Sequence, residues 1–465
     1  MSAMRPHVAD KKRKSSAGGG RLSSDLESSF MLDDLPDAIL VEILCRLPCN
    51  KLIFQYKCVS KRWVSLISAP YFIRLYLHLQ RDLQKPILTT LVTFNHYFKS
   101  QDEYLFISSD EPVFKSIASN FSLSFLPCYQ DPKVLRNLGH EHPWRRLKKR
   151  GHLKAVGLVP PVVVGTYKDL VLCSPTRDLG DYYICNPYTK QWTALPPGPS
   201  RFNTVYAATL VVYDPYYKYS DDDHIIQLNA EYRWKVVQIV PENSTRTDCN
   251  YHVDIFSSET REWRELVVLS SSKPFYLFAN NQHSASMANN GMLYWWRYDG
   301  FMFELDLDQS MSMSSNIAKC RFIELPEGAN IQGLFFPVVS LFVSRGRLRL
   351  CIYDDDRQFS HLPLRVWELN QVVKDDQTGK FKWLADSFAL TSEHIPLDRQ
   401  PCCLYGFHQN DEDIVYLEHD RQLFTCNVRG AKLETTATRN NFHGPPTQVY
   451  YRFVLPWWPT PVPKL

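Results

Sequence analysis

Apolar residues between positions 35 and 80 recur with the period of an α-helix. In the first run they all fall on one helix face: Leu35, Ile39, Leu40, Ile43, Leu44 and Leu47. Asp33 or Asp34 can cap this helix at its N-terminus. Pro36 suits the first helical turn, and Pro48 ends the helix. The run therefore predicts an amphipathic helix.

Two further short helices are predicted after the first one. Asn50 can cap the second helix, and the third begins near Ser60 and stops before Pro70. Their apolar residues are Leu52, Ile53, Tyr56, Trp63, Leu66 and Ile67. Three short helices carry more apolar residues than so small a unit can bury, so we expect part of their surface to bind a partner.

Beyond residue 85 the pattern changes to short strands. Runs rich in β-branched and aromatic residues are bounded by Asp, Asn, Gly or Pro, as at residues 88–94, 170–173, 209–214, 234–240, 340–354 and 414–417. Residues 133–154 contain eight Lys and Arg and interrupt the strands as a predicted surface loop or short helix. The pattern predicts a mainly β protein with a small N-terminal all-α domain.

The strand region also contains a weak internal repeat. Residues 184–192 (ICNPYTKQW) align with residues 255–263 (IFSSETREW), and looser copies begin near residues 303, 366 and 424. An interval of about 60 residues is typical of four-strand units, so we predict a β-propeller of about six blades. The strand at residues 450–455 is expected to close the ring near the first blade. Two β-sandwich domains with chance similarity are the alternative.

Composition and charge narrow the class of protein. Hydrophobic residues make up 44% and charged residues 22% of the 465 residues, which allows a real core. No uncharged apolar run reaches about 18 residues, so we expect no membrane-spanning helix. The formal net charge of +4 argues against a nucleic-acid partner.

The cysteines and the N-terminal residues bear on the cellular compartment. The 12 cysteines form no CxxC pair, and we expect reduced thiols in the nucleus or cytoplasm. Residues 1–30 are rich in Ser, Gly and charge and are expected to be a disordered tail without a secretory signal. Lys11, Lys12, Arg13 and Lys14 form a basic cluster that is either a nuclear-import signal or a plain solvated tail.

The sequence shows no recognised arrangement of catalytic residues. The sequence lacks the GxSxG, HExxH and phosphate-loop patterns. His140, His142 and His152 lie near Glu141, but the surrounding basic residues disfavour a metal cation. We therefore predict no catalytic residue, no metal and no cofactor.

The helical region carries a specific set of residues in unbroken spacing: Leu35, Pro36, Ile39, Leu40, Ile43, Leu44, Leu47, Pro48, Cys58, Val59, Ser60, Lys61, Trp63, Leu66, Ile67 and Pro70. This set resembles the F-box, the module that docks substrate receptors onto the Skp-type adaptor of SCF ubiquitin ligases. The resemblance assigns residues 31–80 to an F-box. Tyr56 stands where the family usually has Phe and keeps its aromatic body.

The resemblance also implies the adaptor-binding residues, which are Leu35, Pro36, Ile39, Leu40, Ile43, Leu44, Leu47, Pro48, Val59, Ser60, Lys61 and Trp63. An amphipathic helix that lays apolar anchors into a partner's groove is a common recognition mode. Some of these residues can pack the core of the F-box instead, which suits Leu44 at least as well. For Leu35, Pro36 and Trp63 we favour the interface.

A second set of residues lies in the strand region: residues 169–173 (DLVLC), 183–187 (YICNP) and 190–192 (KQW), followed by Leu195 and Pro196. This set resembles the F-box-associated domain of plant F-box proteins, whose fold is β-rich and propeller-like. Residues 166–169 (TYKD) replace the glycine-rich entry that is usual in that family. The resemblance assigns residues 86–465 to an F-box-associated β-propeller.

Together these features predict a three-helix F-box followed by a β-propeller of about six blades. The resemblance implies a non-catalytic substrate-recognition subunit of an SCF-type E3 ubiquitin ligase. Its F-box would bind the Skp-type adaptor, and through it the cullin and RING subunits, while the propeller binds a target protein. The alternatives are a propeller enzyme and a non-ligase scaffold. The target and the substrate-binding residues cannot be read, because propeller specificity lies in loops.

Overall fold

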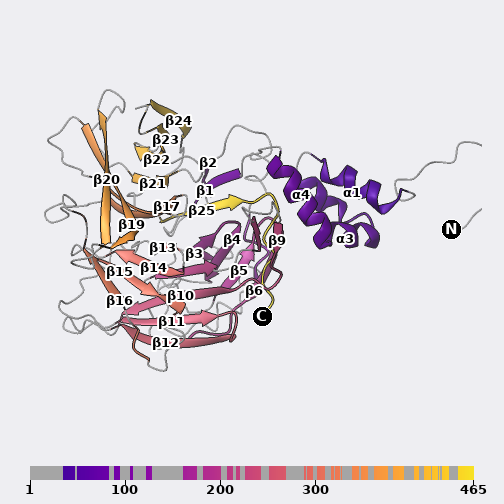
Figure 1. The fold of residues 1–465 in the computed structure, drawn as a ribbon, viewed down its shortest axis with the longest axis horizontal. Helices are drawn as coiled ribbons and strands as arrows, with labels where there is room; N and C mark the ends of the chain where they lie inside the picture. Colours follow the sequence, from indigo (N-terminus) through magenta and orange to yellow (C-terminus); the bar gives the residue numbers. More distant parts are fainter. Residues whose placement is uncertain are drawn as a thin grey trace, which may run out of the picture. The chain divides into compact units, whose positions relative to one another are not determined.

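The structure is a computed structural model, shown in Figure 1. It describes residues 35–47, 50–82, 88–94, 105–107, 122–127, 161–174, 182–199, 207–212, 216–219, 226–241, 251–268, 287–289, 291–296, 301–308, 316–318, 320–324, 326, 338–344, 347–353, 361–374, 381–391, 403–407, 413–419, 422–427, 429, 432–438 and 449–465. The chain divides into two compact units, Met1–Phe72 and Ile73–Leu465.

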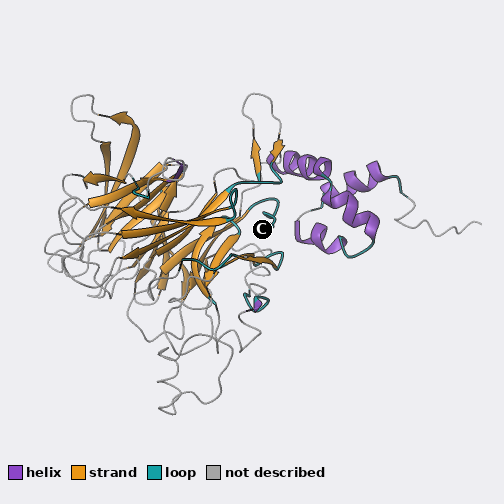
Figure 2. Ribbon diagram, turned by 90° about the horizontal axis from the view of Figure 1, so that it is seen from below, coloured by secondary structure: helices purple, strands orange, loops and turns teal. Residues whose placement is uncertain are grey.

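The described N-terminal residues form the predicted helices α1 (Asp37–Cys45), α2 (Asn50–Tyr56) and α3 (Lys61–Ser68), drawn in purple in Figure 2. Ser60 caps α3, because its Oγ atom accepts a hydrogen bond of 3.3 Å from the backbone N–H of Trp63. The apolar residues that these helices bury are Leu40, Val41, Leu44, Cys45, Ile53, Trp63 and Ile67.

A further helix, α4 (Pro70–Asp82), follows the three that the sequence predicted. Ala69 has extended backbone angles (φ −66°, ψ 136°), so α3 ends at Ser68. Proline disfavours a helical residue before it and suits the first position of a new helix. Pro70 therefore both ends α3 and begins α4. The boundary between the two compact units falls inside α4, after Phe72.

The strands form six sheets of three or four strands among the described residues, all of them antiparallel. Five sheets have four strands: β3 (Val162–Tyr167), β4 (Leu170–Ser174), β5 (Tyr183–Asn186) and β6 (Gln191–Ala194); β7 (Ala207–Val212), β10 (Trp234–Pro241), β11 (Tyr251–Ser257) and β12 (Glu262–Val268); β13 (Met287–Asn289), β14 (Met292–Trp296), β15 (Phe301–Asp306) and β16 (Cys320–Glu324); β17 (Val338–Ser344), β18 (Arg347–Tyr353), β19 (His361–Lys374) and β20 (Phe381–Thr391); β21 (Cys403–Phe407), β22 (Ile414–His419), β23 (Gln422–Asn427) and β24 (Lys432–Thr438).

The sixth sheet joins the two ends of the strand region. It consists of β2 (Leu105–Ile107), β1 (Leu88–Phe94) and β25 (Val449–Leu455), and a small hairpin of β8 (Tyr217–Tyr219) and β9 (Ile226–Leu228) stands apart from all six. One run that reads as continuous in the sequence, residues 340–354, is the hairpin of β17 and β18.

The sheets succeed one another as the blades of a propeller. The first strands of successive four-stranded sheets are neighbours, namely β3 with β7, β7 with β13, β13 with β17, and β17 with β21. Each sheet packs apolar side chains against the next. For example, Val237 and Val253 of one sheet share a buried cluster with Leu293 and Phe303 of the following one. The predicted fold, a small all-α domain followed by a β-propeller, is confirmed.

Strand β25 closes the ring, as its sequence predicted. It pairs along its whole length with β1, from Leu88 opposite Leu455 to Phe94 opposite Val449. Phe453 is buried in one cluster with Val171 of the sheet formed by β3 to β6. The pairing covers one edge of β1 and one edge of β25 that would otherwise be free.

A buried polar cluster anchors the chain after β25. Asp169 Oδ2 accepts hydrogen bonds from Asn186 Nδ2 at 2.7 Å and from the backbone N–H of Thr460 at 2.8 Å. Asn186 Nδ2 also donates to the Thr460 carbonyl oxygen at 2.9 Å, and Tyr232 donates to the Pro461 carbonyl oxygen at 2.6 Å. These contacts hold residues 456–465 against the first two four-stranded sheets.

The internal repeat corresponds to equivalent hairpins in neighbouring sheets. Residues 184–192 span the β5–β6 turn, and residues 255–263 span the β11–β12 turn. Each turn places a basic residue at positive φ, Lys190 at 57° and Arg261 at 59°. Their N–H groups donate to the carbonyl oxygens of Asn186 and Ser257, both at 2.8 Å. The shared sequence pattern therefore encodes one turn geometry.

Several predicted features lie outside the described residues. They are the tail at residues 1–30 with its basic cluster, the caps Asp33 and Asp34, the residue Pro48, the basic segment at residues 133–154 and its histidines. Residues 31–34 at the start of the first predicted domain, and residues 86 and 87 at the start of the second, lie outside them as well.

The stability of the propeller should depend on the charge of Asp169. Burial raises the pKa of this carboxyl from 3.8 to about 6, so the folded chain holds a proton more tightly than the unfolded chain does. The stabilisation from protonation is complete below about pH 4 and is lost as the pH rises through about 6. Because the Asn side chain does not ionise, the Asp169→Asn variant should not lose stability in this way as the pH rises. Its unfolding free energy should gain up to about 3 kcal/mol relative to the unaltered chain between pH 4 and 7.

Thermal unfolding of both proteins across this pH range tests the prediction. Glu259→Gln is the matched control, because it makes the same carboxylate-to-amide change at an exposed position. Stability curves of the Asp169→Asn variant and the unaltered chain that stay parallel would contradict it.

Candidate docking surface

The structure separates the predicted docking residues into an outer and an inner group. Ile39, Ile43 and Val59 are 48%, 45% and 54% exposed, large fractions for aliphatic side chains. Pro36 and Lys61 are also exposed. The remaining described members are half-buried, namely Leu35, Leu47 and Ser60, or buried, namely Leu40, Leu44 and Trp63.

Helix α1 has apolar side chains on two sides. Leu40 and Leu44, one turn apart, are at most 2% exposed, whereas Ile39 and Ile43 point outward. Residues i and i+4 share a face, so the single stripe that the sequence predicts is two adjacent rows. The inner row fills the core of the helices, and the outer row remains available for a partner.

Two exposed apolar residues were missed by the sequence analysis as docking candidates. Val64 on α3 is 43% exposed and Tyr56 at the end of α2 is 36% exposed. The Tyr56 ring lies 5.5 Å from the ring of buried Trp63. Val64 follows Trp63 directly, and consecutive helical residues point about 100° apart, so the inward direction of Trp63 was the signal for an outward Val64.

Arg62 holds the start of α1 against α3. Its Nε atom donates to Asp37 Oδ1 at 2.8 Å, and its Nη2 atom donates to the same carboxylate oxygen and to the Leu35 carbonyl oxygen, both at 2.5 Å. Ion pairs this exposed contribute little to stability. The contacts do fix the backbone that carries Leu35 and Pro36.

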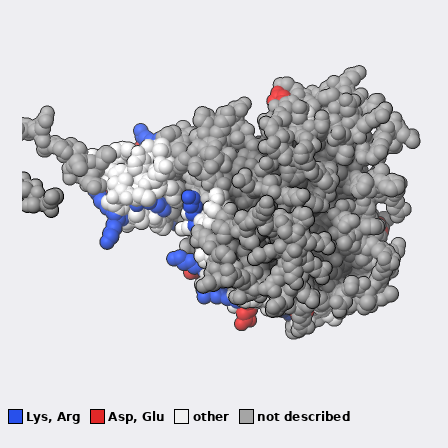
Figure 3. Space-filling view, turned by 180° about the vertical axis from the view of Figure 1, so that it is seen from behind, with Lys and Arg blue, Asp and Glu red and all other residues white. Residues whose placement is uncertain are grey.

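The charges around these helices lie beside the apolar residues. In Figure 3 the described part of the helices is mostly uncharged surface with Lys and Arg side chains at its margin. Arg46 pairs with Glu42 one turn earlier on α1. Burial, and to a smaller extent Glu42, raises the pKa of the Cys45 thiol to about 12, so this thiol stays protonated near neutral pH.

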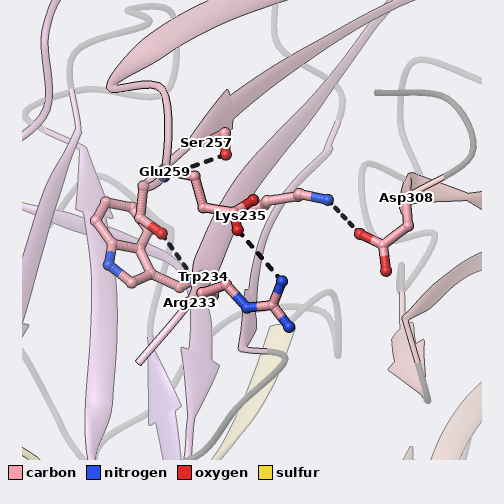
Figure 4. A network of polar contacts seen from close by, with 7 residues as sticks. Arg233, Trp234, Lys235, Ser257, Glu259 and Asp308 are labelled. Atoms are coloured by element: carbon pink, nitrogen blue, oxygen red, sulfur yellow. Dashed lines mark hydrogen bonds and ion pairs between the residues drawn. The ribbon is translucent and has the colours of Figure 1, made fainter. Parts of the chain in front are cut away.

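The polar contacts of the propeller serve its architecture. In Figure 4, Lys235 of β10 reaches Asp308, which follows β15, with an Nζ–Oδ1 distance of 2.6 Å. Arg233 donates to Glu259 at 3.2 Å, and Trp234 N–H donates to Ser258 at 3.0 Å. Lys235 is buried, and its ion pair offsets the cost of burying the charge while joining two neighbouring sheets.

The described part of the chain shows neither a metal-binding cluster nor a membrane-spanning helix. It contains no group of three or more His, Cys, Asp or Glu residues that could hold a metal ion. No helix in it is long and apolar enough to cross a membrane.

Two protein-family models match this chain. The model of the F-box domain matches residues 32–75. The model described as F-box protein At3g26010-like, beta-propeller, matches residues 159–454, which is more than half of the chain. The chain belongs to this F-box β-propeller family.

Related F-box proteins come from Arabidopsis thaliana. F-box protein At5g49610 is 23% identical over 343 residues, covering 72% of this chain and 75% of its own length. F-box protein At5g07610 is 23% identical over 371 residues, covering 78% and 72%. A shorter match, 37% identical over 99 residues, is to the putative F-box protein At1g47765, covering 21% of this chain and 22% of that protein.

The two rows of α1 should respond differently to truncation. Leu44→Ala leaves a cavity in the core of the helices and should destabilise them by about 2–5 kcal/mol. Ile43→Ala removes an exposed side chain and should change their stability by less than about 0.5 kcal/mol. Hydrogen exchange of the amides of α1 to α3 in the full chain measures both effects. Equal protection in the two variants would show that the rows do not differ in burial.

Proposed function

We propose that this F-box protein is the substrate-recognition subunit of an SCF-type E3 ubiquitin ligase. The proposal rests on the outer apolar row of α1, which is exposed although the core of the helices is filled. Ile39, Ile43 and Val59 are at least 45% exposed in a small helical module that matches the F-box model. Such residues suit a groove on a Skp-type adaptor, which in turn would recruit the cullin and RING subunits.

The expected energy of docking is consistent with a few anchors. Full burial of an Ile side chain is worth about 1.5–3 kcal/mol before the costs of association. Ile39 and Ile43 therefore supply part of the binding free energy of a micromolar or tighter complex. Val59 and the half-buried Leu35 add contact area. The charged residues at the margin would contribute orientation more than affinity.

The propeller would bind the target protein, while other subunits carry out ubiquitin transfer. A receptor of this kind accelerates transfer by holding the target close to the charged conjugating enzyme, which raises the effective concentration of the target lysines. The proposed role of this chain is therefore binding and positioning, without a catalytic residue of its own.

A binding measurement with a purified Skp-type adaptor tests the proposal. The double variant Ile39→Ala/Ile43→Ala should bind the adaptor at least tenfold more weakly than the unaltered full chain, because two anchors are lost. The variant Leu35→Ala/Pro36→Ala should also weaken binding. The control is Arg74→Ala, which removes an exposed charged side chain on α4 outside the predicted docking residues and should leave affinity unchanged.

Two outcomes would count against the proposal. If the folded chain does not bind the adaptor, the F-box has another role. If it binds the adaptor but the complex recruits no cullin, the chain is a scaffold outside any ligase. Calorimetry with the adaptor alone, followed by reconstitution with the cullin and RING subunits, distinguishes the two cases.

A further inference from the structure

Strand β6 is the outer strand of the first four-stranded sheet, and its surface is open. The sheet order is β3, β4, β5, β6, so among the described strands β6 has one hydrogen-bonded neighbour, β5. Gln191, Trp192 and Ala194 are exposed and Thr193 is half-buried. Trp192 is 43% exposed, the only tryptophan among the exposed large hydrophobic residues that the structure describes.

Backbone groups of β6 point to the free edge. The Leu195 N–H donates to the Tyr182 carbonyl oxygen at 2.9 Å, and Thr193 lies opposite Ile184. In an antiparallel pair, successive residues direct their N–H and C=O groups alternately toward and away from the neighbouring strand. Trp192 and Ala194 therefore direct theirs away from β5, where a further strand could accept and donate hydrogen bonds.

The equivalent strand in the next sheet shows how such an edge is occupied. The internal repeat relates β6 to β12, and residues 316–318 of the same chain bridge the outer edge of β12 at Val267, a position that the repeat aligns with Pro196 just beyond β6. The Val267 N–H donates to the Asn316 carbonyl oxygen at 2.7 Å, and the Ala318 N–H donates to the Val267 carbonyl oxygen at 3.0 Å. Ile317 lies opposite Val267 in a parallel arrangement. A short extended segment is therefore the shape that fits these outer strands.

The side chains along β6 indicate the chemistry of an occupant. The Trp192 ring meets the Tyr183 ring edge-on at a centroid distance of 5.9 Å, which leaves an aromatic surface for an apolar side chain. At the start of the strand, Lys190 is exposed and is held outside the ladder at positive φ. No acidic side chain in the described part of the chain pairs with Lys190. An acidic residue next to an apolar one would complement both.

We propose that the outer edge of β6 binds an extended segment of the target protein by strand addition, with an apolar side chain on Trp192 and an acidic side chain near Lys190. This inference rests on the proposed function, since it assigns to the propeller the site by which it holds a target. Main-chain hydrogen bonds would supply affinity without sequence preference, and the two side-chain contacts would supply specificity.

The test uses a displayed library of random twelve-residue peptides selected on the full chain. Enriched peptides should combine an acidic residue with an apolar one. Synthetic peptides of the enriched sequence should slow hydrogen exchange at Trp192 and Ala194. Failure to enrich any peptide that protects these amides would overturn the proposal.

Two proline variants separate the free edge from the ladder. Ala194→Pro removes an N–H that points to the free edge, so the protein should keep its unfolding temperature and lose at least tenfold in peptide affinity. Thr193→Pro removes an N–H that points toward β5 and should lower the unfolding temperature. Equal peptide affinity of the unaltered chain and Ala194→Pro would contradict strand addition.

Side-chain variants test the specificity. Trp192→Ala and Lys190→Glu should each weaken the selected peptides at least fivefold, and Lys190→Glu should favour peptides with a basic residue in place of the acidic one. If both variants bind as the unaltered chain does, the proposed contacts are wrong. Arg261→Glu, at the equivalent turn before β12, is the matched control and should leave peptide binding unchanged.

Two controls distinguish this inference from its rivals. Sedimentation of the full chain that reveals self-association abolished by Ala194→Pro would assign the edge to a second copy and overturn the choice of a target segment. Adaptor binding, measured on the same variants, should remain unchanged. If the unaltered chain binds the adaptor but no peptide, the result counts against this inference alone, whereas absence of adaptor binding by the unaltered chain would count against the proposed function.

Discussion

The pairing of β25 with β1 is the contact on which the propeller depends. In a ring of sheets, each sheet buries its faces against two neighbours, so an open ring would expose a face of its first and last sheets. The chain joins its ends through seven residue pairs, from Leu88 opposite Leu455 to Phe94 opposite Val449. It then adds the buried cluster of Asp169, Asn186 and Thr460, which ties the residues after β25 to the first four-stranded sheet.

The helices depend on a different constraint, the small volume of their core. Three short helices cannot bury both apolar rows of α1, so Leu40 and Leu44 are inside and Ile39 and Ile43 are outside. The same limit turns Trp63 inward and leaves Val64 exposed on α3. An exposed apolar row is costly for an isolated protein and useful for one that works in a complex, which is why the proposed function begins from these residues.

Neighbouring sheets with related sequences differ in how their outer edges are treated. Residues 316–318 bridge the outer edge of β12 at Val267, whereas β6 carries the exposed Trp192. Exposed positions of an outer strand, such as Trp192 on β6, take no part in the buried clusters between sheets. They can therefore acquire binding residues without loss of the fold.

Much of the architecture follows from local sequence. Periodicity of 3.6 and of 2 residues identified the helices and strands, the unbroken F-box spacing identified the module, and residues 450–455 were recognised as the closing strand because a ring must pair its ends. Tertiary structure alone decided which side of α1 faces the core, that Pro70 begins a fourth helix, and that Trp192 on β6 is exposed. Which side of a helix faces the core depends on the apolar side chains that compete for one small interior. Other features depend on contacts between residues far apart in the chain, such as Asp169 with Thr460, and no local sequence pattern encodes such contacts.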